Sequence, residues 1–185
     1  DISYSPGGTV SPATVKLAAK VARLSPDPQS RVYFTSGGSE SVETALKMAK
    51  NYQKNVGQAG RYKMISRRGS YHGSTHACMS LGGGYGMQVN YGPLVPGNIH
   101  VAQTNQYRCV FCRDNGRCNL ECARDVERAI QHENPTTVAA FIGEPISASA
   151  GIHVPHPQYW PTIREICDKY GVLMIFDEVI TAFGR

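Results

Sequence analysis

The sequence predicts an α/β fold built on a mostly parallel sheet. Two short segments, residues 138–143 and 171–176, are almost wholly apolar and do not alternate with polar residues. Each follows a segment for which a helix is predicted, residues 121–131 and 158–170. Strands that are apolar on both faces belong to sheets buried on both sides, and such sheets are largely parallel. Alternation of these strands with helices is typical of the α/β class.

The N-terminal part predicts two helices and a strand. Ser11-Pro12 begins the first helix, with serine as N-cap and proline in the first turn, and the proline-rich stretch 26–28 ends it. Residues 31–35 are interpreted as a short strand. After a glycine-rich turn, apolar residues at helical spacing predict a second helix over 39–52.

The middle of the chain is less regular. Residues 61–66 predict another strand. Residues 69–98 are rich in glycine, tyrosine and serine, which indicates an ordered loop region rather than regular structure. No internal repeat or low-complexity segment is present.

Length and composition fit one globular domain. The chain has 185 residues, of which 41% are hydrophobic, and a net charge of +5. An ordinary solvated surface accounts for this charge. The dense basic pair Arg67-Arg68 is not followed by a basic stripe with interleaved aromatic residues, so nucleic-acid binding is not expected.

The ends of the chain suggest a fragment. The chain begins at Asp1 without methionine and stops at Arg185, so we expect both ends to be truncated. Apolar runs such as 171–176 are too short to span a membrane, and no signal-peptide pattern is present. We therefore expect no membrane partner and a cytoplasmic location, or the mitochondrial matrix in a eukaryote.

Four of the six cysteines cluster, with the spacing C-x2-C-x5-C-x3-C: Cys109, Cys112, Cys118 and Cys122. Because nothing suggests secretion, we expect reduced thiols. Four thiolates could bind zinc, which leaves a zinc-dependent interaction module as an alternative. The gap between the two pairs is shorter than in common zinc ribbons, so we assign no metal ligand.

Two predicted loops could hold a phosphorylated ring. The Gly37-Gly38-Ser39 turn precedes a helix, whose free N–H groups and positive dipole end bind anions. The turn could equally be a plain connection with Ser39 as a cap. In Tyr71-His72-Gly73, the aromatic residue could offer its face to a planar ring. The alternative there is a core tyrosine beside a surface histidine.

Two acidic residues follow buried strands. Asp177 ends the apolar run 172–176, and a carboxylate there is costly to bury unless it meets a cation. A protonated pyridine nitrogen is such a cation; an N-cap or a buried salt bridge is the alternative. Glu144 follows the strand 138–143 and could orient a substrate or serve as a turn carboxylate. In parallel sheets ligands bind beyond the carboxyl ends of the strands, where both acids would lie.

Four blocks in order resemble class III pyridoxal-phosphate (PLP) aminotransferases. They are FTSGGSESVETALKMA at 34–49, YHGST at 71–75, GEPI at 143–146 and YGVLMIFDEVITAFGR at 170–185. The resemblance runs nearly end to end and is weakest over about 85–135. It implies fold type I of PLP-dependent enzymes. Residues 1–185 would be a partial PLP-binding large domain with a cysteine-bearing insertion at about 105–123.

The resemblance also implies roles for individual residues. Gly38 and Ser39 would hold the phosphate of PLP. Tyr71 would stack on one face of the ring and Val179 would pack on the other, with His72 beside the stacking residue. Asp177 would pair with the pyridine nitrogen, and Glu144 would lie near the ring and help gate substrate binding. Active sites of this family lie at a homodimer interface.

Two departures from the family pattern affect the assignment. Many relatives have glutamine where this sequence has Ile180, and isoleucine at that position resembles some ω-amino-acid and amine transaminases. The lysine that bonds PLP would lie beyond Arg185, and none of the lysines present, such as Lys47, Lys63 or Lys169, matches it.

The predicted reaction is a ping-pong transamination between an amino donor (an ω-amino acid, an amine or an α-amino acid) and a 2-oxo acid. A lysine acting as acid and base would move the substrate's Cα proton. Aminomutase, decarboxylase, racemase and phospho-lyase chemistry on the same fold remain alternatives. A non-catalytic relative is a further alternative.

Overall fold

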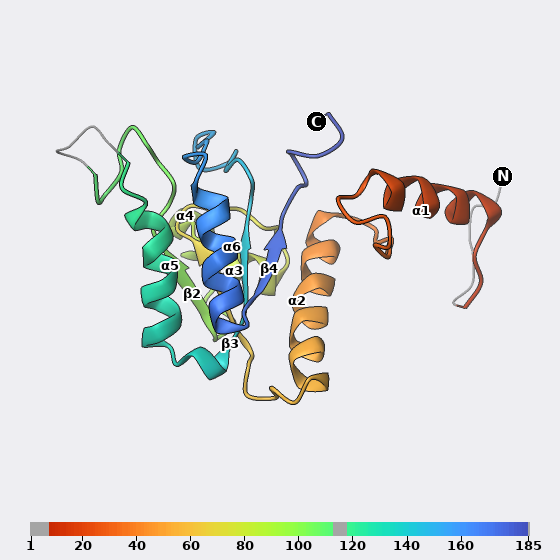
Figure 1. The fold of residues 1–185 in the computed structure, drawn as a ribbon, viewed down its shortest axis with the longest axis horizontal. Coiled ribbons are helices and arrows are strands. Elements are labelled where there is room, and N and C mark those ends of the chain that lie inside the picture. Colours follow the sequence, from red (N-terminus) through yellow and green to blue (C-terminus); the bar gives the residue numbers. More distant parts are fainter. Residues whose placement is uncertain (1–7, 113–117, 185) are drawn as a thin grey trace. The chain divides into compact units, whose positions relative to one another are not determined.

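The computed structural model describes residues 8–112 and 118–184 (Figure 1). The chain divides into two compact units, residues 1–36 and 37–185. In the first unit, α1 (Pro12–Leu24) begins as predicted, because Ser11 Oγ accepts a hydrogen bond from the Thr14 amide at 3.2 Å. The strand predicted for 31–35 is wrong: these residues form no regular element. A strand needs a pairing partner, and every described strand pairs elsewhere.

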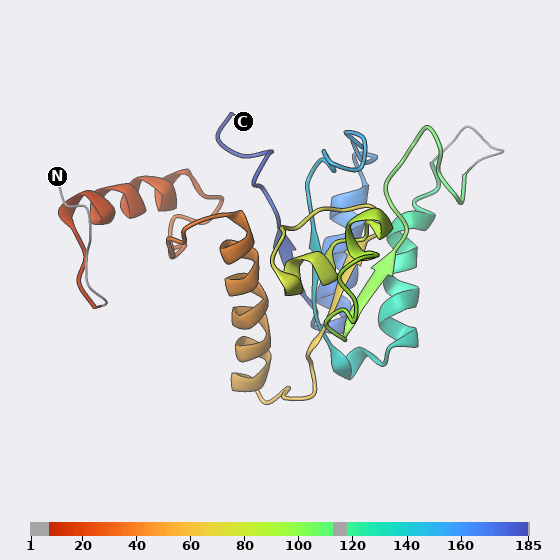
Figure 2. The ribbon, with the colours of Figure 1, turned by 180° about the vertical axis from the view of Figure 1, so that it is seen from behind.

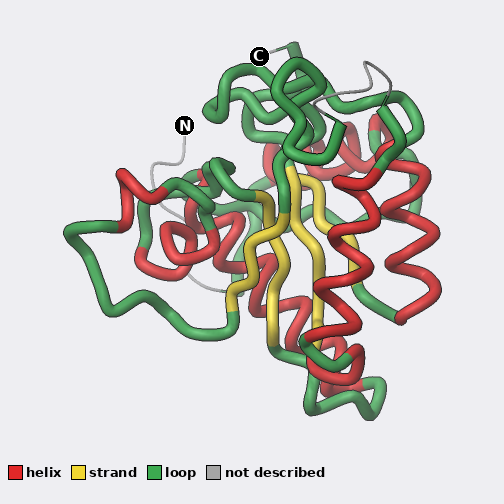
Figure 3. The backbone as a smooth tube through the Cα atoms, turned by 90° about the vertical axis from the view of Figure 1, so that its left-hand side faces the viewer, coloured by secondary structure: helices red, strands yellow, loops and turns green. Residues whose placement is uncertain are grey.

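The second unit contains a four-stranded sheet (Figure 3). Its neighbouring strands are all parallel, as predicted. Its order is β2-β1-β3-β4. The strands are β1 (Lys63–Arg67), β2 (Asn98–Val101), β3 (Val138–Gly143) and β4 (Leu173–Phe176). Three of them match predicted segments. The edge strand β2 was missed, because it has only four residues and begins at the end of the glycine-rich stretch 69–98.

The longer helices of this unit match the segments predicted as helices, residues 39–52, 121–131 and 158–170. They are α2 (Gly38–Asn55), α5 (Glu121–His132) and α6 (Tyr159–Tyr170). The short helices α3 (His76–Leu81) and α4 (Tyr85–Gln88), and the 3-10 turn η1 (Pro135–Thr137), were not predicted. The loop prediction for 69–98 is therefore wrong in part, because α3 buries four consecutive residues despite its glycine-rich flanks. Among the described residues, no helix is long and apolar enough to cross a membrane.

The sheet is buried on both faces, which explains the uninterrupted apolar strands. On one face α5 and α6 pack together against the sheet, while α2 and α3 cover the other (Figures 1 and 2). Successive strand residues serve opposite layers: Ile65 and Phe141 join the α5 and α6 side, whereas Met64 and Ile142 join the α2 and α3 side. Burial of both faces leaves the strand ends as the places where polar groups can gather.

A buried glutamine fastens α2 to the sheet. Gln53 is only 2% exposed, and its Nε2 donates to the carbonyl oxygens of Ala139 at 3.2 Å and Gly171 at 3.1 Å. These contacts connect α2 to β3 and to the residue that ends α6. The amide therefore fixes the orientation of α2, whose other end begins at Gly38.

We expect Gln53→Leu to lower the free energy of unfolding by about 1–3 kcal/mol, because it removes a donor from buried carbonyl groups. Urea unfolding measures the change. The exposed Gln58→Leu is the matched control and should stay within about 0.5 kcal/mol of the parent. Equal stability of the two variants would contradict the bridging role of Gln53.

Candidate functional site

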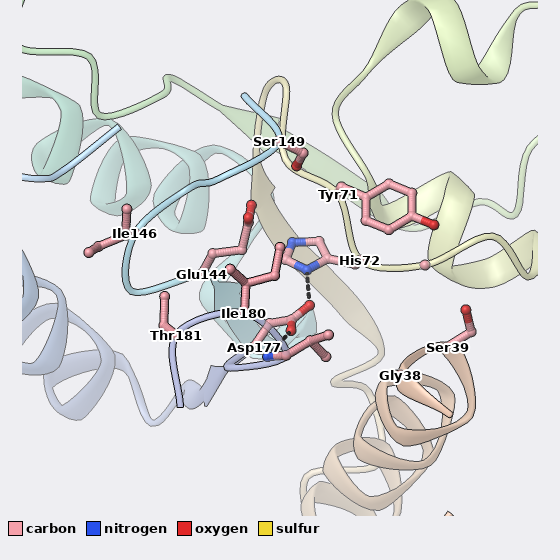
Figure 4. Close-up of a pocket in the computed structure, with 12 residues that line it drawn as sticks. Gly38, Ser39, Tyr71, His72, Glu144, Ile146, Ser149, Asp177, Ile180 and Thr181 are labelled. Carbon is pink, nitrogen blue, oxygen red and sulfur yellow. Dashed lines mark hydrogen bonds and ion pairs between the residues drawn. The ribbon is translucent and has the colours of Figure 1, made fainter. Parts of the chain in front are cut away.

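The carboxyl ends of the strands open onto one pocket (Figure 4). Four segments line it: the start of α2 and the chain that follows β1, β3 and β4. The lining residues are Gly38, Ser39, Tyr71, His72, Gly73, Glu144, Ile146, Ser149, Asp177, Val179, Ile180 and Thr181. All seven residues predicted for the site are among them. The structure thus brings together groups that are far apart in the sequence, while their individual roles stay predictions.

The start of α2 contributes an uncapped helix end. The N-cap residue is Gly37, and no side chain in the described part of the chain caps the helix, so the alternative of Ser39 as a cap is wrong. Instead, Ser39 Oγ accepts a hydrogen bond from the Ser74 amide at 3.1 Å. A methyl group added at Gly38 would lie 3.2 Å from Cγ2 of Val179. The helix end is therefore packed closely against the segment after β4, on the wall of the pocket.

Gly73 allows the loop after β1 to approach this helix end. Its φ of +127° is unfavourable for residues with a side chain, and an added Cβ would lie 2.5 Å from Ser39 Oγ. Only glycine fits such a contact without displacing one of the two segments. The glycine of the Tyr71-His72-Gly73 motif thus has a packing reason as well as a conformational one.

The alternative of a core tyrosine beside a surface histidine is wrong, because Tyr71 is exposed and His72 is buried. Tyr71 is 40% exposed on the pocket wall, whereas His72 is 2% exposed. His72 Nδ1 donates a hydrogen bond to Asp177 Oδ2 at 2.8 Å (Figure 4). Its Nε2 is buried and has no hydrogen-bond partner within the described residues. His72 is therefore a hydrogen-bond partner of Asp177, and Tyr71 is the exposed residue of the pair on the pocket wall.

Asp177 is held at the end of β4 by two contacts. One oxygen accepts the His72 hydrogen bond, and Oδ1 accepts a longer one from the Val179 amide at 3.3 Å. The residue is 9% exposed and lines the pocket. Asp177 thus has a buried hydrogen-bond partner in His72, so its burial alone does not identify a function. Because Asp177 also lines the pocket, a cation bound there could reach it.

Glu144 also combines a structural and a pocket position. Its Oε1 accepts a hydrogen bond from Ser147 Oγ at 2.8 Å, and its Oε2 accepts one from the Ala148 amide at 3.2 Å. These are the contacts of a turn carboxylate, and they fix the side chain while it lines the pocket. A fixed, 6% exposed carboxylate can orient a charged or hydrogen-bonding partner.

The cysteine cluster forms a second pocket, away from the first. Its lining residues are Thr104, Asn105, Gln106, Cys109, Cys112, Cys118, Cys122 and His156. In residues 8–112 and 118–184, no three His, Cys, Asp or Glu side chains are arranged so that they could hold a metal ion. Burial, followed by the neighbouring Cys118 and Cys109, raises the pKa of Cys122 to about 12. Burial raises that of Cys167 to about 11.

We expect iodoacetamide at pH 8 to modify Cys112 and Cys118 first. Cys112 and Cys118 are partly exposed. Cys167 is buried, and with a pKa of about 11 only about 0.1% of it is thiolate at that pH. Peptide mass spectrometry of the native protein measures the order, and Cys167 should react only in denaturant or as the pH approaches 11. Protection of Cys112 and Cys118 that a chelator relieves would contradict free thiols and favour the zinc alternative.

Two groups near the site were not found from the sequence. Ser149 lines the pocket but follows Glu144 without any motif of its own. Arg67 was noted only as half of a dense basic pair, and the structure shows that it is fully buried and contacts Glu144. A basic residue within an apolar strand pattern was the signal that could have indicated burial.

Sequence comparison identifies relatives along nearly the whole chain. The class III aminotransferase family matches residues 2–185. A probable aminotransferase of Mycobacterium tuberculosis is 42% identical over 96% of this chain and 38% of its own length. The β-alanine–pyruvate aminotransferase of Pseudomonas aeruginosa is 40% identical over 100% of this chain and 41% of its own. The chain thus spans about two fifths of the length of these relatives.

Solved structures give the same result. An amine transaminase from an uncultivated Pseudomonas species, in a PLP-bound form, matches with a TM-score of 0.91 and 38% identity. The match covers 98% of this chain and 41% of that one. An (S)-enantioselective ω-transaminase from Thermomicrobium roseum matches with a TM-score of 0.89 and 42% identity, over 97% and 40% of the two chains. The likeness confirms the predicted fold type I of PLP-dependent transferases, and this chain belongs to the class III aminotransferases.

Proposed function

We propose that the protein containing this chain transfers an amino group from an amine, an ω-amino acid or an α-amino acid to a 2-oxo acid, with PLP as cofactor. One observation carries the proposal: the seven residues assigned from the sequence line a single pocket at the carboxyl edge of the sheet. Relatives named as β-alanine–pyruvate and putrescine–pyruvate aminotransferases support the substrate classes.

The residues present fit a phosphorylated pyridine. An uncapped helix end at Gly38 suits a phosphate, and a buried carboxylate at Asp177 suits a protonated ring nitrogen. Half-exposed Tyr71 and Val179 offer apolar surfaces on the walls of the same pocket. PLP, when bound, would withdraw electrons from the substrate carbon that carries the amino group.

Each side chain would then have a separate task. The free N–H groups of Gly38 and Ser39 would bind the phosphate. Asp177 would hold the proton on the ring nitrogen, and His72 would hold Asp177 through the hydrogen bond to Oδ2. Glu144 would orient the substrate-side groups, because Ser147 and the Ala148 amide fix its carboxylate. Tyr71 and Val179 would exclude water from the two faces of the ring.

Several further features belong to the proposal. We infer a homodimer in which a partner subunit completes the site, as the family resemblance implies. The cytoplasmic location stays a prediction, as does the assignment of 105–123 to a cysteine-bearing insertion. Ile180, which lines the pocket, supports a preference for amine or ω-amino-acid donors.

The test separates the two half-reactions in the full-length protein. Purified protein loaded with PLP is mixed with an amine or ω-amino acid, and the loss of PLP absorbance is followed. A 2-oxo acid is then added, and the absorbance should return with release of an amino acid. Decarboxylation, racemisation or elimination without this return would favour the alternative PLP chemistries. Absence of PLP binding would overturn the proposal.

A further inference from the structure

A buried arginine lies behind the candidate site. Arg67 ends β1, and its side chain has no exposed surface (0%), whereas its neighbour Arg68 is exposed. A guanidinium stays charged at physiological pH. Burial of a charge is costly unless it is paired or hydrogen-bonded. The groups around Arg67 must therefore compensate its charge.

The contacts of Arg67 connect three strand ends. Nη2 donates to the carbonyl oxygen of Glu144, which follows β3, and Nη1 donates to Oγ1 of Thr104 beyond β2 at 3.1 Å. Cζ lies 5.4 Å from the Trp160 ring centroid and 5.9 Å from that of Tyr159. Nε has no hydrogen-bond partner within the described residues. In the same part of the chain, no ion pair includes Arg67.

These contacts fix the backbone that carries Glu144. Arg67 binds the Glu144 carbonyl, and Trp160 Nε1 donates to the next carbonyl, that of Pro145, at 3.2 Å. The Trp160 ring also packs against Phe176, with centroids 4.6 Å apart, and Phe176 directly precedes Asp177. Arg67 and Trp160 thus form one packed unit behind both acidic residues of the pocket.

The two acidic residues of the pocket are held by different groups. His72 contacts the carboxylate of Asp177, whereas Arg67 contacts the carbonyl oxygen of Glu144. Glu144 and Asp177 are 6% and 9% exposed, and both line the pocket. A shift of the Glu144 backbone would therefore move a carboxylate on the pocket wall.

We propose that Arg67 is a positioning residue, which fixes the backbone of Glu144 and thereby the place of its carboxylate in the pocket. The inference rests on the proposed function, because the role of Glu144 belongs to that function. Arg67 acts through Glu144 and touches neither substrate nor cofactor in this scheme. Its effect on the reaction therefore depends on the Glu144 side chain.

A double-mutant cycle in the full-length protein tests this dependence. Arg67→Met is made in the parent and in a Glu144→Gln background. Arg61→Met is the matched control, since Arg61 donates to the carbonyl oxygens of Val138 at 3.0 Å and Tyr170 at 2.9 Å, at the opposite edge of the sheet. Its Nε also lacks a partner within the described residues. The readouts are kcat/KM of each half-reaction, PLP occupancy and the thermal midpoint.

We expect Arg67→Met to lower kcat/KM about 30-fold in the parent and less than about threefold beside Glu144→Gln, because residues that act as a unit are non-additive. Arg61→Met should lower the thermal midpoint similarly and leave kcat/KM within about twofold. Equal losses in both backgrounds, or equal activity losses at positions 67 and 61, would overturn the inference. A parent protein without PLP binding or transamination would overturn the proposed function and this inference with it.

If Arg67→Met does not fold, Arg67→Lys and Arg61→Lys replace the methionine variants. Lysine keeps the charge but lacks the planar fork that reaches two acceptors. Arg67→Lys should lower kcat/KM about fivefold, and only when Glu144 is present. Unchanged activity, or a loss independent of the residue at 144, would count against Arg67.

Discussion

Replacing Asp177 by alanine is expected to lower turnover of the full-length enzyme by about 10⁴-fold, because the ring nitrogen would no longer keep its proton and the cofactor would lose its strength as an electron sink. The carboxylate is buried, faces the pocket and has His72 to hold one oxygen. The rate of PLP absorbance loss with a saturating amino donor measures the effect on one half-reaction. PLP content, measured separately, distinguishes slow chemistry from poor binding.

The control for this variant is Asp168→Ala on α6. Asp168 has 68% of its side chain exposed and pairs with Arg164 at 2.6 Å, and such surface pairs contribute little to stability. We expect this variant to react at the parent rate. Near-normal turnover of Asp177→Ala would refute the proposed pairing with the ring nitrogen. The aspartate would then be a structural partner of His72.

Local sequence patterns predicted the elements that bury apolar residues. The apolar run 138–143 became β3 with the same bounds, and the segments predicted as helices, residues 39–52, 121–131 and 158–170, became α2, α5 and α6. Local patterns do not predict the pairing of strands, because pairing depends on which segment lies beside a strand in the folded chain. Residues 31–35 have strand-like composition but pair with no described strand, whereas β2 has only four residues and still pairs with β1.

The site shows the same division between local and distant causes. Glycine turns and acids at strand ends are local features, and the parallel sheet brings them to one edge. The hydrogen bond between His72 and Asp177 joins residues 105 positions apart, which no local pattern specifies. The burial of Arg67 was not predicted, because its charge was weighed without its strand neighbours. Its burial depends on Trp160 and Glu144, far along the chain.

Gly73→Ala is expected to have the second large effect, a loss of PLP affinity of about 100-fold together with a destabilisation of about 2–3 kcal/mol. The added methyl group would lie 2.5 Å from Ser39 Oγ and 3.0 Å from Ser39 Cα, so the start of α2 would have to move. That helix end is the proposed phosphate site. Titration of the apo protein with PLP, followed by absorbance, measures the affinity.

Gly57→Ala separates the clash from backbone strain. Gly57 also has a positive φ, +82°, but nothing lies within 4 Å of an added Cβ. We expect this variant to lose about 1 kcal/mol of stability and to bind PLP like the parent. If both variants weaken PLP binding equally, the effect comes from general destabilisation. If Gly73→Ala alone is impaired, contact between the tyrosine–histidine loop and the start of α2 sets the affinity for the phosphate. The Ser74 amide reaches Ser39 Oγ, 35 positions away along the chain, because Gly73 carries no methyl group that would keep the two segments apart.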